Sequence, residues 1–285
     1  MALVLPFPAI DPVLVTIPLG VIDLPIRWYA LAYLAGLFIG LVIVRRLVAR
    51  PALWPGEAPP MTREQVESLL TWMVFGVILG GRLGFVFFYQ PAYYLANPGE
   101  ILQVWSGGMS FHGGFLGVIL AVIAFCRLNR APLMQVADAV AVATPAGLLL
   151  GRIANFINGE LWGRPTDAPW AMVFPGAGPE PRHPSQLYEA GLEGLLLLVL
   201  MLWLAFRGGW LRRPGMLTGL FFIGYGLARA FVENFREPDA QFVTAANPEG
   251  HVIPLFAGLG FTMGQALSLP MVFVGLGFWA FARRR

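Results

Sequence analysis

Residues 135–164 read QVADAVAVATPAGLLLGRIANFINGELWGR. The first part, 135–152, is predominantly apolar and close to the roughly 20 residues that a helix needs to cross the hydrocarbon core of a bilayer. The second part, 151–164, places two arginines, two asparagines and a glutamate where such a helix should end. Charged groups near a bilayer persist only where a partner, a cavity or the interface compensates them. The stretch therefore predicts a membrane helix that ends in a polar site.

The rest of the chain has the composition of a membrane protein. Of its 285 residues, 57% are apolar and only 12% are charged, a balance that soluble domains of this size almost never show. Seven apolar runs of suitable length lie near 28–44, 67–89, 109–126, 135–152, 186–206, 215–233 and 264–281. We expect an all-α integral membrane protein with seven transmembrane helices, folded as one polytopic domain over residues 1–285.

The positions of the arginines predict the orientation of these helices. The chain has no lysine, and cytoplasmic loops collect positive charge. Arginines follow the first, third, fifth and seventh runs: Arg45, Arg46, Arg50, Arg63, Arg127, Arg130, Arg207, Arg212, Arg213, Arg283, Arg284 and Arg285. We therefore expect the N-terminus outside, on the periplasmic face, and the C-terminus in the cytoplasm. The orientation leaves Arg27, Arg82, Arg152, Arg164, Arg182, Arg229 and Arg236 unexplained.

Several expected absences limit the chemistry. Most of the basic excess is this topological signal, so we expect no nucleic-acid partner. Cys126 is the only cysteine, which excludes an intramolecular disulfide and favours a packing role. The three histidines, His112, His183 and His251, lack the spacing of metal ligands, so we expect no metal and no cofactor, although folding could still bring them together. Prolines interrupt residues 1–26, which we interpret as an outer segment along the interface.

Glycines four residues apart recur in the apolar runs. The pairs are Gly36 with Gly40, Gly76 with Gly80, Gly113 with Gly117 and Gly147 with Gly151. Small residues at this spacing allow two membrane helices to approach closely. We expect many of these glycines to serve packing.

Two polar groups begin predicted helices. Arg27, Trp28 and Tyr29 are typical of an interface anchor, although Tyr29 could equally face a site. His112, followed by Gly113 and Gly114, could exchange a proton near neutral pH, and the glycines would let a substrate or another backbone approach. The alternative for His112 is a hydrogen-bonded helix cap.

The segment after the fourth run can bind an anion. Arg152, Asn155 and Gly159 would share one face if the helix continues, with Glu160 close by. A guanidinium matches phosphate with two parallel hydrogen bonds, and a nearby carboxylate can orient it or act as a base. The alternative is a purely structural Arg–Glu pair.

Two further segments are polar within or beside apolar runs. In His183-Pro184-Ser185-Gln186-Leu187-Tyr188-Glu189, the serine suits a helix cap, while Gln186, Tyr188 and Glu189 could line a polar cavity. Tyr225, Arg229 and Glu233 repeat every four residues and so form a polar stripe on one helix face. Arg229 lies well within the run and needs an anion, from Glu233 or from a ligand.

Together these segments resemble a known family. His112-Gly113-Gly114, the stretch Gly151 to Arg164, the stretch His183 to Glu189, and Phe235-Arg236-Glu237-Pro238-Asp239 are similar to the signature blocks of bacterial phosphatidylglycerol:prolipoprotein diacylglyceryl transferases. The blocks occur in the same order, and the resemblance runs from about Arg27 to the last run. It implies a transferase of the bacterial inner membrane, with its site toward the periplasmic side. The enzyme would move a diacylglyceryl group from phosphatidylglycerol to the lipobox cysteine in the signal peptide of a preprolipoprotein, forming a thioether and releasing glycerol phosphate.

The resemblance also implies roles for individual residues. By family analogy His112 would be the base that generates the thiolate, although Glu160 could also handle the proton. On physical grounds we expect Arg152 and Arg229 to hold the phosphate, because guanidinium groups stabilise the charge of the leaving group. The positions that match substrate-binding or supporting residues are Tyr29, Gly113, Asn155, Gly163, Tyr225, Glu233 and Arg236. Ala154 and Asn234 depart from the family pattern, where glycine and an aromatic residue are expected.

Two other classes of protein remain as alternatives. A transporter or flippase for an anionic lipid would also need buried arginines, but on both halves of the membrane. Here the charges within predicted helices gather toward the outer side, with Asp138 as the main inner exception. A non-enzymatic scaffold does not explain why Arg152, Arg229, Glu160 and Glu233 occupy costly positions.

Overall fold

The seven predicted membrane helices are present in the computed structural model, which describes residues 5–18, 20, 23–255 and 259–284. The segments long and apolar enough to cross a membrane are Trp28–Val48, Arg63–Phe88, Phe111–Leu128, Leu133–Ile157, Ser185–Phe206, Met216–Phe235 and Met263–Arg283. Large apolar side chains such as Leu34, Phe38 and Leu116 are exposed along them, at 64%, 65% and 54%. Apolar exposure on this scale marks a surface that contacts lipid or protein. The prediction of an all-α membrane protein is confirmed.

The described chain divides into two compact units, which we treat separately. The first unit comprises Met1–Ile43 and Val140–Arg285, and the second comprises Val44–Ala139. Helices α1 (Trp28–Val48) and α5 (Leu133–Ile157) contribute residues to both units. The single domain expected over the whole chain stays a prediction.

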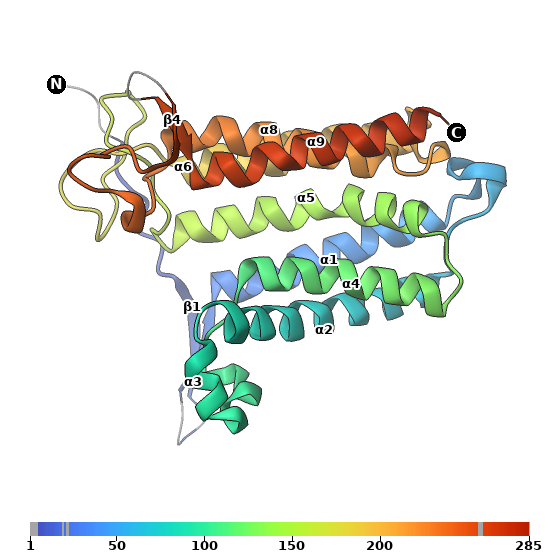
Figure 1. Ribbon diagram of the computed structural model, residues 1–285, viewed down its shortest axis with the longest axis horizontal. Helices are drawn as coiled ribbons and strands as arrows, with labels where there is room; N and C mark the ends of the chain where they lie inside the picture. The colour runs from blue at the N-terminus through green and yellow to red at the C-terminus, as the bar shows by residue number, and fades with distance from the viewer. Residues whose placement is uncertain (1–4, 19, 21–22, 256–258, 285) are drawn as a thin grey trace. The chain divides into compact units, whose positions relative to one another are not determined.

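In the second unit, helices α2 (Arg63–Phe88) and α4 (Phe111–Leu128) lie side by side (Figure 1). Their glycines meet backbone to backbone: a Cβ on Gly76 would lie 2.9 Å from the carbonyl carbon of Gly117, and one on Gly84 would lie 2.7 Å from the Cα of Gly113. The predicted close approach is therefore confirmed for this helix pair. It also gives Gly113 a packing role.

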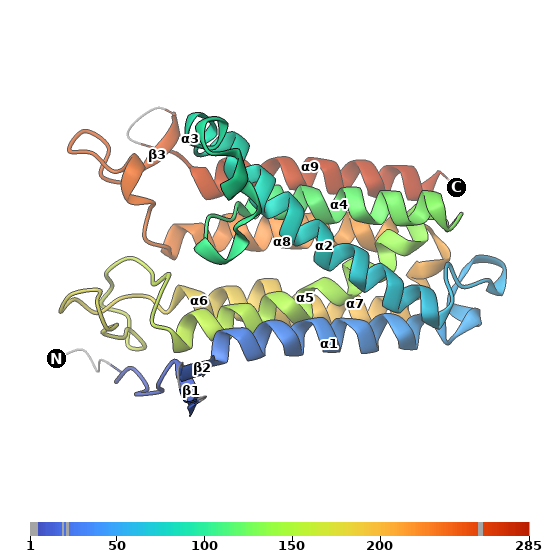
Figure 2. The same cartoon turned by 90° about the horizontal axis from the view of Figure 1, so that it is seen from below.

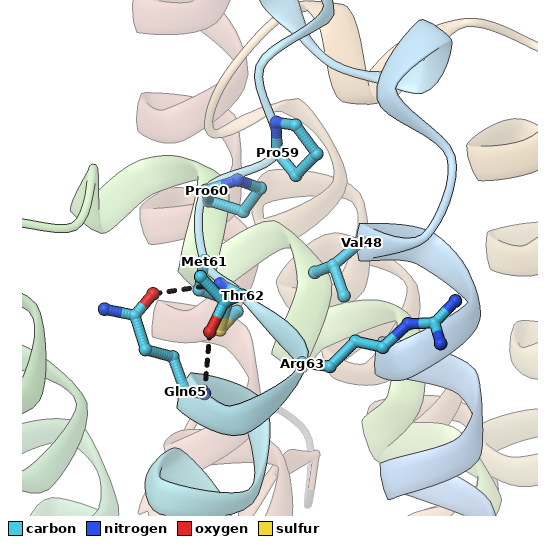
Figure 3. Close-up of a pocket in the computed structure, with 7 residues that line it drawn as sticks. All are labelled: Val48, Pro59, Pro60, Met61, Thr62, Arg63 and Gln65. Atoms are coloured by element: carbon cyan, nitrogen blue, oxygen red, sulfur yellow. Dashed lines mark hydrogen bonds between the residues drawn. The ribbon is translucent and has the colours of Figure 1, made fainter.

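The start of α2 is fixed by a reciprocal cap. The backbone N–H of Gln65 donates to Thr62 Oγ1 at 3.2 Å, and the backbone N–H of Thr62 donates to Gln65 Oε1 at 2.9 Å (Figure 3). Such a capping box satisfies two donors that a helix start leaves free. The shallow hollow beside it is lined by Val48, Pro59, Pro60, Met61, Thr62, Arg63 and Gln65. None of the predicted site residues lines this hollow.

Arg82 of α2 organises the connection to α4, which contains α3 (Pro91–Ala96) and the 3₁₀ turns η3 (Pro98–Leu102) and η4 (Val104–Ser106). It is only 3% exposed and donates to the carbonyl oxygens of Ile101, Gly107 and Glu100 at 2.8, 2.6 and 2.6 Å. Its guanidinium therefore holds the loop before His112, and this accounts for one of the arginines that orientation left unexplained. A pair of short 3₁₀ turns, η1 (Pro51–Leu53) and η2 (Pro55–Glu57), precedes α2.

The first unit carries the remaining membrane helices. Helices α8 (Met216–Val232) and α9 (Met263–Arg283) lie side by side (Figures 1 and 2), where a Cβ on Gly219 would lie 2.8 Å from the carbonyl oxygen of Gly275. In the same way, a Cβ on Gly36 of α1 would lie 3.0 Å from the Cα of Gly147 in α5. The turns η6 (Trp210–Arg212), η7 (Glu233–Phe235) and η8 (Ala240–Phe242) lie in the connections around α8.

Two small antiparallel hairpins complete this unit. Strands β1 (Val13–Pro18) and β2 (Asp23–Arg27) lead directly into α1, and β3 (His251–Pro254) pairs with β4 (Gly260–Thr262) before α9. The sequence predicted an outer segment along the interface before α1, which stays a prediction, but it did not predict these strands. The prolines prevent these segments from forming a helix, and strand pairing gives their backbone N–H and C=O groups hydrogen-bond partners instead.

Helix α5 runs past its predicted end at Arg152 and continues to Ile157, so Arg152 and Asn155 both lie on helical backbone. It closes with the N–H of Glu160 bonded to the Asn155 carbonyl at 3.1 Å and the N–H of Gly159 bonded to the Phe156 carbonyl at 2.9 Å. This is the Schellman pattern, and Gly159 adopts φ +65° as it requires. The expectation that Gly159 would share a helical face with Arg152 is therefore wrong, because Gly159 forms the turn.

The fifth membrane segment is not a uniform α-helix. It begins as α6 (Ser185–Glu189), widens into a π-helical stretch η5 (Ala190–Leu196), and continues as α7 (Leu197–Phe206). A Cβ on Gly194 in the π stretch would lie 2.6 Å from the Cα of Leu149 in α5. The π-helical stretch is thus packed directly against α5. It carries one glutamate, Glu193, and Glu189 ends α6 just before it.

Candidate active site

Three arginines and three glutamates lie together inside the first unit, and we call them the arginine–glutamate cluster. They come from α5, α6, η5, α8, η7 and the residue after η7: Arg152, Glu189, Glu193, Arg229, Glu233 and Arg236. Glu189 and Glu193 have no exposed surface, and Glu233 is 8% exposed. Charges this deep in a membrane chain persist only because they compensate one another.

Glu189 contacts all three arginines. Its Oε1 accepts hydrogen bonds from Nη1 of Arg229 at 3.0 Å and Nη1 of Arg236 at 2.8 Å, and its Oε2 lies 3.3 Å from Nε of Arg152. One carboxylate from α6 therefore aligns guanidinium groups from three other segments. From the sequence, Glu189 was a residue that could line a polar cavity, and its role as the anion shared by these arginines was not predicted.

Glu233 forms the second anchor of the cluster. Its Oε2 lies 2.7 Å from Nη2 of Arg229, one helical turn earlier, and 3.5 Å from Nε of Arg236. Thr262, the N-cap of α9, donates its hydroxyl to Glu233 Oε1 at 3.0 Å. A Cβ on Gly264 would overlap the Glu233 carboxylate, so a larger residue there would force that carboxylate to shift. Arg229 therefore has Glu233 as an anion, one of the two alternatives that the sequence left open, and it also pairs with Glu189, which the sequence did not predict.

Glu193 is the residue that the sequence analysis missed. It lies one turn after Glu189 in the π-helical stretch, and its Oε2 is 3.8 Å from Nη2 of Arg152. The signal was present in the sequence, because an acid among the leucines of the run 186–206 is costly and so marks a functional position. It escaped notice because no motif contains it.

Asn155 and Glu160 form a polar pair at the end of α5. Glu160 Oε1 accepts from Nδ2 of Asn155 at 2.8 Å and Nδ2 of Asn158 at 3.2 Å, and its backbone carbonyl accepts from Nε2 of Gln186 at 2.5 Å. Tyr29 interacts with both Asn155 and Glu160, so the start of α1 reaches this pair.

Tyr225 connects the polar stripe of α8 to the cluster. It lies close enough to Arg152, Arg229 and Glu193 to interact with them electrostatically, and Arg152 interacts in the same way with Tyr29. The first unit therefore brings together the larger part of the predicted site: Tyr29, Arg152, Asn155, Glu160, Tyr225, Arg229, Glu233 and Arg236.

Gly163 lies where two connecting loops touch. Its N–H donates to the His183 carbonyl at 2.9 Å, and a Cβ would lie 2.7 Å from that of His183 and overlap the Phe235 carbonyl. Arg164, the next residue, donates through Nε to the Arg236 carbonyl at 2.9 Å and pairs with Glu249. Gly163 therefore sets the backbone position from which Arg236 reaches Glu189.

His183 takes part in a short hydrogen-bond chain. Nε1 of Trp170 donates to the Tyr188 hydroxyl at 2.6 Å, and that hydroxyl lies 3.0 Å from Nδ1 of His183. Burial lowers the pKa of His183 below its ordinary value of 6.5. A neutral imidazole that accepts at Nδ1 fits this arrangement.

His112 and Gly113 belong to the second unit. The Ser110 hydroxyl accepts from the Gly113 N–H at 3.2 Å and so caps α4, which leaves His112 in the first turn with its side chain exposed. Ser110, and not His112, is therefore the residue that caps this helix. A role for His112 as a base stays a prediction.

Fold and site define a class: a multi-pass membrane protein whose helices enclose a compensated cluster of arginines and glutamates, next to an amide-bound carboxylate. The particular family follows from comparison with known proteins. The model of the prolipoprotein diacylglyceryl transferase family matches residues 12–281, and the chain belongs to that family.

Close relatives cover nearly the full chain. A protein of Cereibacter sphaeroides is 56% identical over 95% of this chain and 96% of its own length, and one of Roseobacter denitrificans is 54% identical over 100% and 99%. One of Rhizobium meliloti is 50% identical over 99% and 95%. All three carry the name phosphatidylglycerol–prolipoprotein diacylglyceryl transferase.

Proposed function

We propose that this protein transfers the diacylglyceryl group of phosphatidylglycerol to the lipobox cysteine in the signal peptide of preprolipoproteins, the first step of lipoprotein maturation. The observation that supports this activity most directly is the arginine–glutamate cluster in a membrane chain of this family. A lipid phosphate is the anion that a site among membrane helices would meet.

The reaction requires a carbon–oxygen bond to break beside the lipid phosphate. The cysteine thiolate attacks the glycerol carbon of the diacylglyceryl group, a thioether forms, and glycerol phosphate leaves with the bonding electrons. Negative charge gathers on the leaving phosphate, and fixed guanidinium groups in a water-poor site stabilise it. Arg152 and Arg229 are the residues that would carry this role, with Tyr29, Asn155, Tyr225 and the remaining cluster residues supporting them.

The thiol comes from the protein substrate. The single cysteine of the chain, Cys126, is buried in α4. A free thiol is mostly protonated near neutral pH, so a base must generate the thiolate. His112 and Glu160 are the two candidates, and the exposed imidazole and the amide-bound carboxylate can each accept a proton.

The chain would reside in the bacterial inner membrane as one polytopic domain. With the N-terminus periplasmic and the C-terminus cytoplasmic, the ends of α5 and α8 and the connections that follow them face the periplasmic side. Phosphatidylglycerol and the signal peptide would therefore meet near the outer leaflet.

The test is direct. Purified protein in detergent is incubated with phosphatidylglycerol and a lipobox peptide, and the peptide is analysed by mass spectrometry. The expected result is a mass gain of one diacylglyceryl group on the cysteine, absent for a Cys→Ser peptide. An unmodified peptide, with the protein shown to be folded and to bind lipid, would contradict the proposal.

A further inference from the structure

The charges of the arginine–glutamate cluster balance one another. It contains three arginines, Arg152, Arg229 and Arg236, and three glutamates, Glu189, Glu193 and Glu233. Fully ionised, the cluster therefore has no net charge. A lipid phosphodiester would add one negative charge to a neutral, largely buried site, and an uncompensated charge there is costly.

The three glutamates are not equally compensated. Glu189 contacts all three arginines, and Glu233 contacts two arginines and the Thr262 hydroxyl. Among the residues that the structure describes, Glu193 has a single cation within ion-pair distance, Arg152 at 3.8 Å. Both of its carboxylate oxygens are buried without a hydrogen-bond partner in the described part of the chain. Of the three, Glu193 depends most on one partner.

Arg152, the partner of Glu193, is also the arginine of the cluster with the longest ion-pair contacts. Arg229 and Arg236 each donate a hydrogen bond to Glu189 and lie near Glu233, whereas the Arg152 contacts are 3.3 and 3.8 Å long. The Arg152 side chain is 20% exposed, compared with 14% for Arg229 and 13% for Arg236. An incoming phosphate would therefore bind Arg152 first and compete with Glu193 for its charge.

We propose that Glu193 takes up a proton from solvent when an anionic lipid phosphate binds at Arg152, so that lipid binding and protonation are coupled. The inference rests on the proposed function. The charged and titratable groups that act on Glu193 are Glu189 on its own segment, Arg152 on α5, Tyr225 and Arg229 on α8, and Arg236 after η7. Protonation removes the charge that has lost its partner and keeps the cluster neutral.

This role differs from that of the other carboxylates. Glu193 would be a positioning residue that releases Arg152 to the phosphate, whereas Glu189 and Glu233 would keep Arg229 and Arg236 fixed throughout. The π-helical turn that carries Glu193 supports this division, because such turns interrupt regular helices at functional positions.

The test measures protons taken up on binding. Dioleoylphosphatidylglycerol in dodecyl maltoside is titrated calorimetrically into the full chain without peptide, in two phosphate-free buffers with different heats of ionisation. Wild-type protein should take up close to one proton per lipid at pH values where Glu193 is ionised before binding. There, the apparent Kd should rise about tenfold per pH unit, as linkage of one proton requires. Dioleoylglycerol, which lacks the phosphate, should cause no uptake.

Two glutamine variants locate the proton. Glu193→Gln should bind phosphatidylglycerol with uptake near zero and a Kd that no longer depends on pH. Glu67→Gln is the matched control, because Glu67 is 56% exposed and pairs with Arg45 outside the cluster. It should behave as wild type.

The outcomes separate the two proposals. Lipid binding by wild-type protein without proton uptake at any pH overturns the inference alone, and this holds even if Glu193→Gln fails to fold. Uptake that persists in Glu193→Gln also overturns it, because the proton then goes elsewhere. Absence of phosphatidylglycerol binding by folded wild-type protein would overturn the proposed function and the inference with it.

Discussion

The hydroxyl of Thr262 donates to Oε1 of Glu233 at 3.0 Å and so joins the first turn of α9 to the end of α8. The start of a helix carries partial positive charge, which favours an anion at this position. Glu233 in turn pairs with Arg229 at 2.7 Å. The orientation of a cluster arginine therefore depends on the exact position of α9.

Gly264 gives a direct test of that dependence. A Cβ there would overlap the Glu233 carboxylate, so Gly264→Ala should displace Glu233, disturb Arg229 and reduce transfer. Overpacking of this kind typically costs about 1–3 kcal/mol of stability, which thermal unfolding in detergent would detect. Gly277→Ala is the matched control on the same helix, where a Cβ would have no atom of the described residues within 4 Å. Equal effects of both changes would contradict the structural argument.

Arg152 and Arg229 should both be required for transfer. Arg152→Ala and Arg229→Ala remove charges that would stabilise the leaving phosphate, and loss of one such donor typically costs about 100-fold or more in rate. Arg152→Lys should recover only part of the activity, because an ammonium group cannot form two parallel bonds. Arg45→Ala, at an exposed ion pair, should leave the rate unchanged. Normal transfer by both alanine variants in membranes would exclude the phosphate clamp.

His112→Gln tests the first candidate base. A general base works only when unprotonated, so the wild-type rate should fall at acidic pH. The variant should lose this limb of the pH profile and roughly 100-fold or more in rate. The measurement is initial rate against pH for both proteins with the same peptide. An unchanged rate and profile would remove His112 as the base.

Glu160→Gln tests the second candidate. Glutamine preserves the size of the side chain, but its amide cannot take the proton. We expect a moderate loss of rate from weaker bonding to Asn155 and Asn158, with the acidic limb retained. Disappearance of that limb in Glu160→Gln, together with its persistence in His112→Gln, would assign the base to Glu160.

Stability should decline at acidic pH through His183. Because burial lowers its pKa in the folded protein, the unfolded chain binds a proton first as pH falls below 6.5. Folding stability is therefore full above 6.5 and decreases with falling pH until the folded form is also protonated. Melting temperatures in detergent between pH 7.5 and pH 5, values chosen to span roughly this window, should show this slope, and His183→Gln should flatten it. A slope that the variant leaves intact would assign it to other groups.

The membrane helices were predictable because a helix that crosses a bilayer needs a long apolar run, whatever it packs against. The end of α5 was less so. Arg152 and Asn155 make the run look shorter than it is, because they can remain helical only where partners from other segments compensate them. Neither those partners nor the glycine turn at Gly159 follows from local hydropathy.

The site was predictable only where polar residues cluster along the sequence. Motifs identified Arg152, Arg229, Asn155 and Glu160. The shared use of Glu189 by three arginines depends on how α5, α6 and α8 pack, so the sequence did not reveal it. Glu193 lies among leucines and belongs to no motif. The hairpins β1–β2 and β3–β4 are held by backbone hydrogen bonds, and the side-chain pattern of these segments does not predict that pairing.

The glycine contact between α2 and α4 restricts how substrates can travel. Gly76, Gly80, Gly84, Gly113 and Gly117 bring the two backbones so close that even a methyl group would collide. An acyl chain is a row of methylene groups, each about as thick as a methyl group, so it cannot pass between these helices where they make this contact. Lipid substrate and lipidated product must therefore enter and leave at other positions, because the α2–α4 contact is closed to them.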